Sequence, residues 1–222
     1  AHQHTTTKVG YISVAPLTDL LFADGFEANN LSAWSSAVTD GDNLSASPAA
    51  AMLGSYGMAA DINDNNPLYV MDYTPSSESR YRARFYFDPN SIAMANNDGH
   101  NILRAVQGSS GTLFYMLFIR QSDMYQVRIT YLDDLLGYRS MSYQALSDAP
   151  HFIELDWQAG AGTGQLSLWV DGALRGSVAN ITNASQRVDS LVLGPYAGID
   201  AGTRGTYFFD AFESRRLSYI GP

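Results

Sequence analysis

Apolar and polar residues alternate along most of the chain with a period of two, and the helical period of 3.6 is nearly absent. The clearest example is SRYRARFYF at residues 79 to 87, where every second residue is apolar or aromatic and three of the residues between them are arginines. Such a run predicts a strand with one buried and one exposed face. The same pattern predicts strands at residues 68–73, 112–120, 125–132, 151–157, 165–172, 190–194 and 206–216.

Turn-forming residues separate these predicted strands. Clusters of Gly, Asn, Asp, Ser and Pro occur at residues 63–67, 96–100 and 159–164. Many short strands with turns at near-regular spacing are typical of an antiparallel sandwich. The pattern therefore predicts an all-β jelly-roll β-sandwich over residues 21–222, with no linker dividing it.

The first twenty residues lie outside this pattern. They contain one strand-forming run, VGYISV at residues 9 to 14, which ends before Pro16. A strand without a hairpin neighbour must pair with a distant part of its own chain or with another chain, and both options stay open. If it pairs with another copy, the head-to-tail contact builds a filament. The predicted assembly strand then consists of Val9, Tyr11, Ile12 and Val14.

Composition narrows the class of protein. The 222 residues include 22 acidic and 13 basic ones, for a net charge of −9, so the chain repels the phosphates of nucleic acid. The absence of cysteine excludes disulfides and thiolate metal sites. No apolar run approaches the roughly 18 residues of a membrane-spanning helix. The start at Ala1 and four Asn-x-Ser/Thr sequons, at Asn30, Asn43, Asn180 and Asn183, predict an extracellular or cell-surface glycoprotein.

A hairpin near the C-terminus carries the most specific pattern. In HFIELDWQAGAGTGQLSLWVDGALRG, residues 151 to 176, a strand ending in Trp157 turns through a glycine-rich loop into a strand that ends in Val170-Asp171-Gly172. This hairpin resembles that of the concanavalin A-like, laminin G-like jelly-roll modules of secreted bacterial proteins. The similarity extends over about residues 21 to 220. It implies the fold but no single function, because this fold includes enzymes, lectins and structural modules.

The resemblance also implies how the two ends of the domain meet. The sequence Asp-x-Phe-Glu occurs at residues 24–27 and again at 210–213, and in such jelly rolls the first and last strands lie side by side. A structural Ca²⁺ commonly sits there and takes six to eight oxygen ligands. The matching positions are Glu27, Gly41, Asp42, Asn43 and Asp210. Alternatively, Asp24 and Asp210 cap turns, with Phe26 and Phe212 in the core.

No complete catalytic constellation is present. Glu154 and Asp156 match two acids of the glucanase pattern E-x-D-x-x-E, but Ala159 replaces the third, and retaining hydrolysis needs a second carboxyl about 5 Å from the nucleophile. An exposed acidic strand face explains the two acids. Alginate-type lyases of this fold carry the motif Q-I/V-H. The run QVRI at residues 126 to 129 lacks its histidine. The sequence therefore predicts a protein without enzymatic activity, and a polysaccharide lyase or glycoside hydrolase is the weakest alternative.

Two binding functions remain. The first is a secreted structural or adhesive protein that assembles with copies of itself through residues 9 to 14. The alternative is a carbohydrate-binding module, since tyrosine and tryptophan stack on sugars and arginine binds carboxylates. Exposed aromatic candidates also include Trp169 and Tyr196. The predicted glycan face consists of Arg82, Arg84, Tyr86, Arg128, Tyr138 and Tyr143.

Overall fold

The structure is a computed structural model that describes residues 18–109 and 111–222. Its described residues form strands and one turn of 3-10 helix, η1 (Pro48–Ala50). Nine strands form sheet A: β1 (Leu20–Asp24), β3 (Leu44–Ser47), β4 (Gly57–Ile62), β6 (Arg80–Asp88), β7 (Ala93–Met94), β13 (His151–Gln158), β14 (Ala161–Val170), β15 (Ala173–Thr182) and β17 (Thr203–Arg215). Eight form sheet B: β2 (Ser36–Val38), β5 (Tyr69–Asp72), β8 (Gly99–Gln107), β9 (Gly111–Gln121), β10 (Met124–Asp133), β11 (Gly137–Ser140), β12 (Gln144–Leu146) and β16 (Ser190–Ala197).

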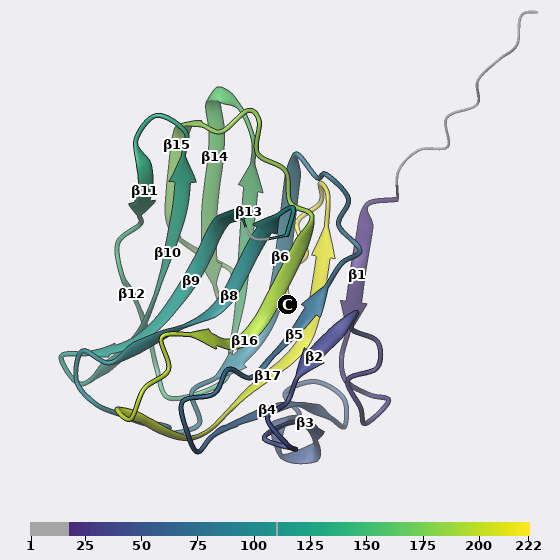
Figure 1. The fold of residues 1–222 in the computed structure, drawn as a ribbon, viewed down its shortest axis with the longest axis vertical. Helices are drawn as coiled ribbons and strands as arrows, with labels where there is room; N and C mark the ends of the chain where they lie inside the picture. The colour runs from purple at the N-terminus through teal and green to yellow at the C-terminus, as the bar shows by residue number, and fades with distance from the viewer. Residues whose placement is uncertain (1–17, 110) are drawn as a thin grey trace, which may run out of the picture.

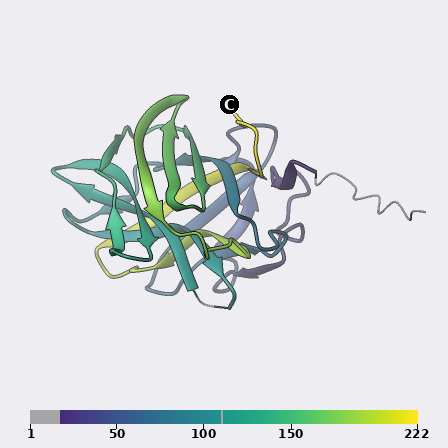
Figure 2. The ribbon, with the colours of Figure 1, turned by 90° about the horizontal axis from the view of Figure 1, so that it is seen from above.

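The two sheets pack face to face as a sandwich (Figures 1 and 2). Sheet A has the order β15-β14-β13-β6-β17-β4-β3, and β1 and β7 also pair with β17. Sheet B has the order β11-β10-β9-β8-β16-β5-β2, and β12 pairs with β10. The predicted all-β antiparallel sandwich is therefore confirmed. Among the described residues, no helix has the length and apolar character needed to cross a membrane.

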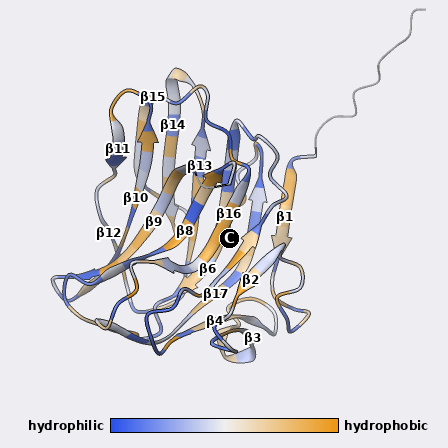
Figure 3. Cartoon of the chain, in the orientation of Figure 1, coloured by the Kyte–Doolittle hydropathy of each residue, from blue (hydrophilic) through white to orange (hydrophobic). Residues whose placement is uncertain are grey.

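The alternation in β6 explains how the core forms. Tyr81, Ala83, Phe85 and Phe87 are fully buried between the sheets, whereas the arginines between them point away from the core. Burying a large apolar side chain contributes about 1.5–3 kcal/mol, so each such strand is held by its inward residues. Figure 3 shows the same division along the chain, with apolar segments in the strands and hydrophilic ones in many of the turns.

The repeated Asp-x-Phe-Glu marks a seam between the two ends of the domain. β1 pairs antiparallel with β17, and Asp24 lies opposite Phe212. Phe26 and Phe212 are both buried, and their rings lie 6.1 and 5.0 Å from that of Trp34. The Trp34 indole N–H also donates to Asp24, at 2.9 Å. The prediction that the first and last strands lie side by side, with both phenylalanines in the core, is confirmed.

All eight strands predicted within the described residues are present. Several other strands were not predicted, because they lack a clear alternation of apolar and polar residues. β8 is shifted in register against β9 at two places, so its inward and outward residues do not alternate evenly. β15 is an edge strand with mostly exposed residues, so it lacks an apolar pattern. β2 to β4 are three to six residues long, too short for a periodicity to stand out.

Candidate functional site

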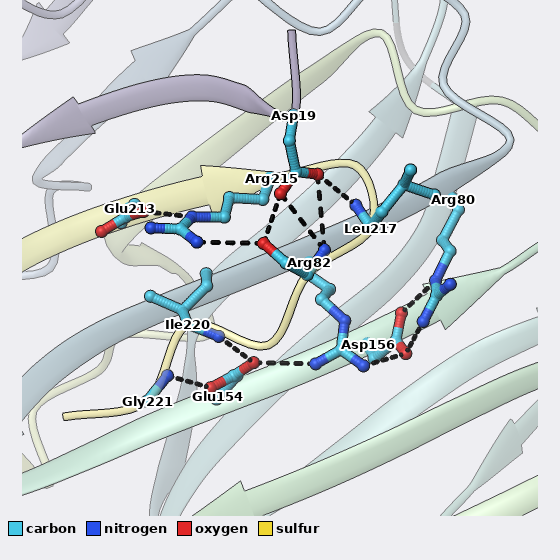
Figure 4. A network of polar contacts seen from close by, with 11 residues as sticks. Asp19, Arg80, Arg82, Glu154, Asp156, Glu213, Arg215, Leu217, Ile220 and Gly221 are labelled. Carbon is cyan, nitrogen blue, oxygen red and sulfur yellow. Dashed lines mark hydrogen bonds and ion pairs between the residues drawn. The ribbon is translucent and has the colours of Figure 1, made fainter.

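The outer face of sheet A carries arginines that are paired with acids on β13. The Arg82 guanidinium lies 2.9 Å from Glu154 Oε1 and 2.7 Å from Asp156 Oδ2, and Arg80 lies 2.8 Å from the same Asp156 oxygen. These pairs follow from the register, which places β13 directly beside β6. Figure 4 shows Arg82 held between the two acids.

The C-terminal segment covers this network. Glu154 is fully buried, and its two oxygens accept the backbone N–H groups of Ile220 at 3.1 Å and Gly221 at 3.0 Å (Figure 4). The Arg82 guanidinium also lies 5.5 Å from the ring centroid of Trp169. The interpretation of Glu154 and Asp156 as an exposed acidic face is therefore wrong, because both acids form ion pairs with arginines and the C-terminal segment covers Glu154.

The six residues of the predicted glycan face do not share a face. β6 belongs to sheet A, whereas β10 and β11 belong to sheet B. Parity along the strands could not reveal this, since it does not say which sheet a strand joins. Arg82, Arg84 and Tyr86 lie on the outside of sheet A, and Arg128, Tyr138 and Tyr143 lie on sheet B or next to it.

A groove of about 360 Å³ opens on the outer face of sheet B. We call it the sheet B groove. It lies across β8, β9, β11 and β16, so segments distant in sequence form one surface. Its lining residues are Asn101, Arg104, Thr112, Tyr115, Tyr138, Tyr196 and Ala197.

Polar and ring contacts fix the side chains of the sheet B groove. Arg104 Nε donates to Thr112 Oγ1 at 2.8 Å, and Nη1 donates to the Tyr196 hydroxyl at 2.5 Å. The Arg104 guanidinium also stacks 5.0 Å from the Tyr196 ring. The Tyr138 hydroxyl donates to the Thr112 carbonyl at 2.9 Å, and its ring lies 6.4 Å from that of Tyr115. The groove thus has aromatic rings and polar groups held in place by neighbours.

Of the groove residues, Tyr138 and Tyr196 were predicted from the sequence to be exposed aromatic residues, whereas Arg104 and Tyr115 were not predicted. The sequence nevertheless contains a signal for each of these two residues. Arg104 is the one charged residue in the apolar stretch ILRAV, and Tyr115 alternates with the buried residues Phe114 and Met116 on either side. The sequence does not show that these two residues are neighbours. Strand pairing places Tyr115 directly opposite Arg104.

Glu27 and Asp210, two of the predicted calcium ligands, face the loop that precedes β4. Asp210 is fully buried, and its Oδ2 accepts the backbone N–H groups of Met52 and Leu53, both at 2.7 Å. Glu27 Oε1 accepts the Ser55 N–H at 2.9 Å. Burial raises the pKa of Asp210, and the charge of Glu27 acts in the same direction. The two carboxylates hold this loop beside the seam.

The other three predicted ligands, Gly41, Asp42 and Asn43, lie at the opposite end of β3. The Asn43 carbonyl accepts the Asp61 N–H there, at 2.8 Å. Within residues 18–109 and 111–222, no group of three or more His, Cys, Asp or Glu residues could hold a metal ion. The predicted set does not form one site. Calcium binding at Glu27 and Asp210 stays a prediction that melting with and without a chelator would check, and equal midpoints would contradict it.

The four sequons differ in accessibility. Asn30 and Asn180 are exposed, and Asn43 is half-buried, so glycosylation of these three stays a prediction. Asn183 is fully buried, and its Oδ1 accepts the Gly160 N–H at 2.8 Å. A buried side chain leaves no room for a glycan in the folded chain, so the prediction for Asn183 is wrong.

The predicted assembly strand lies outside the described residues, and its pairing stays a prediction. Its residues are Val9, Tyr11, Ile12 and Val14. The described chain already contacts the domain before the predicted boundary at residue 21. Asp19 Oδ1 accepts the Leu217 N–H at 2.6 Å, and β1 begins at Leu20.

Comparison with known proteins supports the fold alone. The sequence matches no protein-family profile and no curated protein. The T. cruzi calreticulin globular domain matches with a TM-score of 0.62 and 10% identity, over 90% of this chain and 88% of that one. The chain has the concanavalin A-like jelly-roll fold. This result confirms the resemblance inferred from the hairpin at residues 151 to 176.

Toxin binding domains with this jelly roll match as well. The binding domain of Paraclostridial Mosquitocidal Protein 1 has a TM-score of 0.61 and 9% identity over 91% of this chain and 50% of that one. A structure of botulinum neurotoxin type C, whose cell entry depends on interaction with two ganglioside molecules, has a TM-score of 0.57 and 10% identity over 80% of this chain and 42% of that one. The chain thus spans half or less of these toxin domains.

Proposed function

We propose that this chain is a carbohydrate-binding module and that sugars bind in the sheet B groove. The observation that carries the proposal is the groove itself, which Tyr115, Tyr138 and Tyr196 line together with Arg104. Tyrosine offers an apolar ring face together with a polar hydroxyl, which suits the mixed surface of a sugar. A few fixed polar groups beside aromatic walls are the usual composition of a ligand site. The ganglioside interaction of the matching botulinum neurotoxin gives further support.

Replacing a groove tyrosine is expected to weaken glycan binding without unfolding the chain. In Tyr196→Ala, the ring that contacts Arg104 is lost, so affinity should fall by about tenfold or more, as for a central aromatic contact. A glycan array followed by calorimetry measures this. Tyr73→Ala removes an exposed tyrosine outside the groove and serves as the control. If no glycan bound the wild-type chain, the proposal would be wrong.

We further propose that the chain is extracellular and assembles with its own copies through residues 9 to 14. The favouring observation is the open edge of sheet A. Among the described strands, β15 pairs only with β14, and most of its residues are exposed. Backbone N–H and C=O groups along such an edge can bind an added strand.

Deleting residues 1 to 16 is expected to abolish self-association. The deletion leaves the contacts of Asp19 with the C-terminal segment in place, so the domain should stay folded. Light scattering of the full and shortened chains measures the mass, and circular dichroism checks the fold. An unchanged mass after deletion would contradict the assembly proposal.

A further inference from the structure

Arg128 on β10 has a guanidinium that faces no acid. Within the described part of the chain, Arg128 makes no ion pair and no hydrogen bond, and its Nε is buried without a partner. The guanidinium instead lies 4.5 Å from the ring centroid of Tyr143. The terminal nitrogens are not among the buried polar atoms, so they remain in contact with solvent. A cation over an aromatic ring is attracted to the ring, but the ring does not neutralise its charge.

The arginines of sheet A show how this chain neutralises a guanidinium that has a structural role. Arg80, Arg82 and Arg84 on β6 each contact a carboxylate, at 2.7 to 3.3 Å. The chain contains 22 acidic residues, so carboxylates that could pair with an arginine are abundant. The buried Nε does not distinguish Arg128, because the Nε atoms of Arg82 and Arg84 are also buried without a partner. Arg128 differs from the three arginines of β6 in having no carboxylate beside its guanidinium, so an external anion can bind its solvent-exposed terminal nitrogens.

Arg128 lies on the same face as the sheet B groove. It stands opposite Leu117 on β9, and Leu117 stands opposite Asn101 on β8, which lines the groove. Two strand spacings of 4.7–4.9 Å therefore separate Asn101 from Arg128, or about 10 Å between backbones. A ligand that fills the groove and extends across β9 thus reaches the guanidinium.

We propose that the sheet B groove takes an anionic sugar and that Arg128 binds its carboxylate or sulfate group. The inference rests on the proposed carbohydrate-binding function and names the class of sugar. Arginine suits both groups, because its planar donors can bind two oxygens of the anion at once. The ring of Tyr143 holds the guanidinium in place before the ligand arrives, so less side-chain freedom is lost on binding.

Calorimetry of the full chain with matched sugars tests the proposal. The probes are an oligogalacturonate, a sialylated oligosaccharide and a sulfated galactan oligosaccharide, each compared with its methyl ester, its asialo form or its unsulfated form. The wild-type chain should prefer at least one anionic member over its neutral counterpart by about tenfold or more. Arg128→Gln should remove this preference and leave neutral binding unchanged, whereas Arg128→Lys should keep part of it.

The remaining outcomes separate the two proposals. Arg175→Gln, which removes an exposed arginine on β15, should leave the preference intact and controls for net charge. If sugars bind through Tyr196 but the anionic and neutral members bind equally, or if Arg128→Gln keeps the preference, only the inference about Arg128 is overturned. If no sugar binds at all, both proposals fail.

Discussion

Glu154→Leu is expected to lower the free energy of unfolding by about 3–5 kcal/mol, the usual effect of removing one partner of a buried ion pair. Glu154 is fully buried and receives three donors, namely Arg82 and the backbone N–H groups of Ile220 and Gly221. Leucine has a similar size but no acceptor. The substitution therefore leaves a buried guanidinium with Asp156 as its remaining acid partner and frees the C-terminal segment.

Urea unfolding followed by circular dichroism measures this loss, and the melting midpoint should fall by about 10 °C in a domain of this size. Asp123→Ala is the matched control, because it breaks the ion pair between Arg120 and a mostly exposed acid. Such surface pairs contribute about 0–1 kcal/mol. Equal effects of the two substitutions would show that the network under the C-terminal segment does not stabilise the fold.

Acidification from about pH 6.5 to about pH 4 is expected to reduce the free energy of unfolding by about 3 kcal/mol through His100 alone. Burial lowers the pKa of His100 to about 4, although the charge of Asp200 acts in the opposite direction. The ring is 1% exposed, and its Nε2 lies 2.9 Å from the Tyr207 hydroxyl. The unfolded chain takes up the proton at a higher pH than the folded chain does. The contribution of His100 to stability is therefore complete above pH 6.5 and is lost as the pH falls towards 4.

His100→Gln should flatten this dependence, since glutamine can still bond the Tyr207 hydroxyl but does not titrate in this range. The quantity to compare is the difference between the two proteins in urea-derived stability at each pH. Asp24, Asp72 and Asp210, whose pKa values burial raises, titrate in both proteins and cancel in the difference. Parallel pH profiles for wild type and variant would contradict the role given to His100.

The sandwich was predictable because its core strands repeat every two residues, and the candidate site was predictable only in part. Tyr138, Tyr143, Tyr196 and Arg128 were identified as exposed polar or aromatic residues. Their grouping was wrong, because β6 was assumed to share a face with β10 and instead joins the other sheet. Side-chain parity is a local property, whereas sheet membership depends on pairing between distant segments.

The sequence by itself determined which residues of the predicted strands face the core and indicated that the two Asp-x-Phe-Glu segments meet at a seam. The first follows from local alternation, and the second was implied by the resemblance to jelly-roll modules. The tertiary structure alone decided which arginines are neutralised. Arg82 pairs with Glu154, 72 residues away, and its charge is balanced by the acids beside it, whereas Arg128 has no acid partner among the described residues. The reason is physical, since a charge is neutralised by what lies near it in space, and strand pairing decides which residues those are.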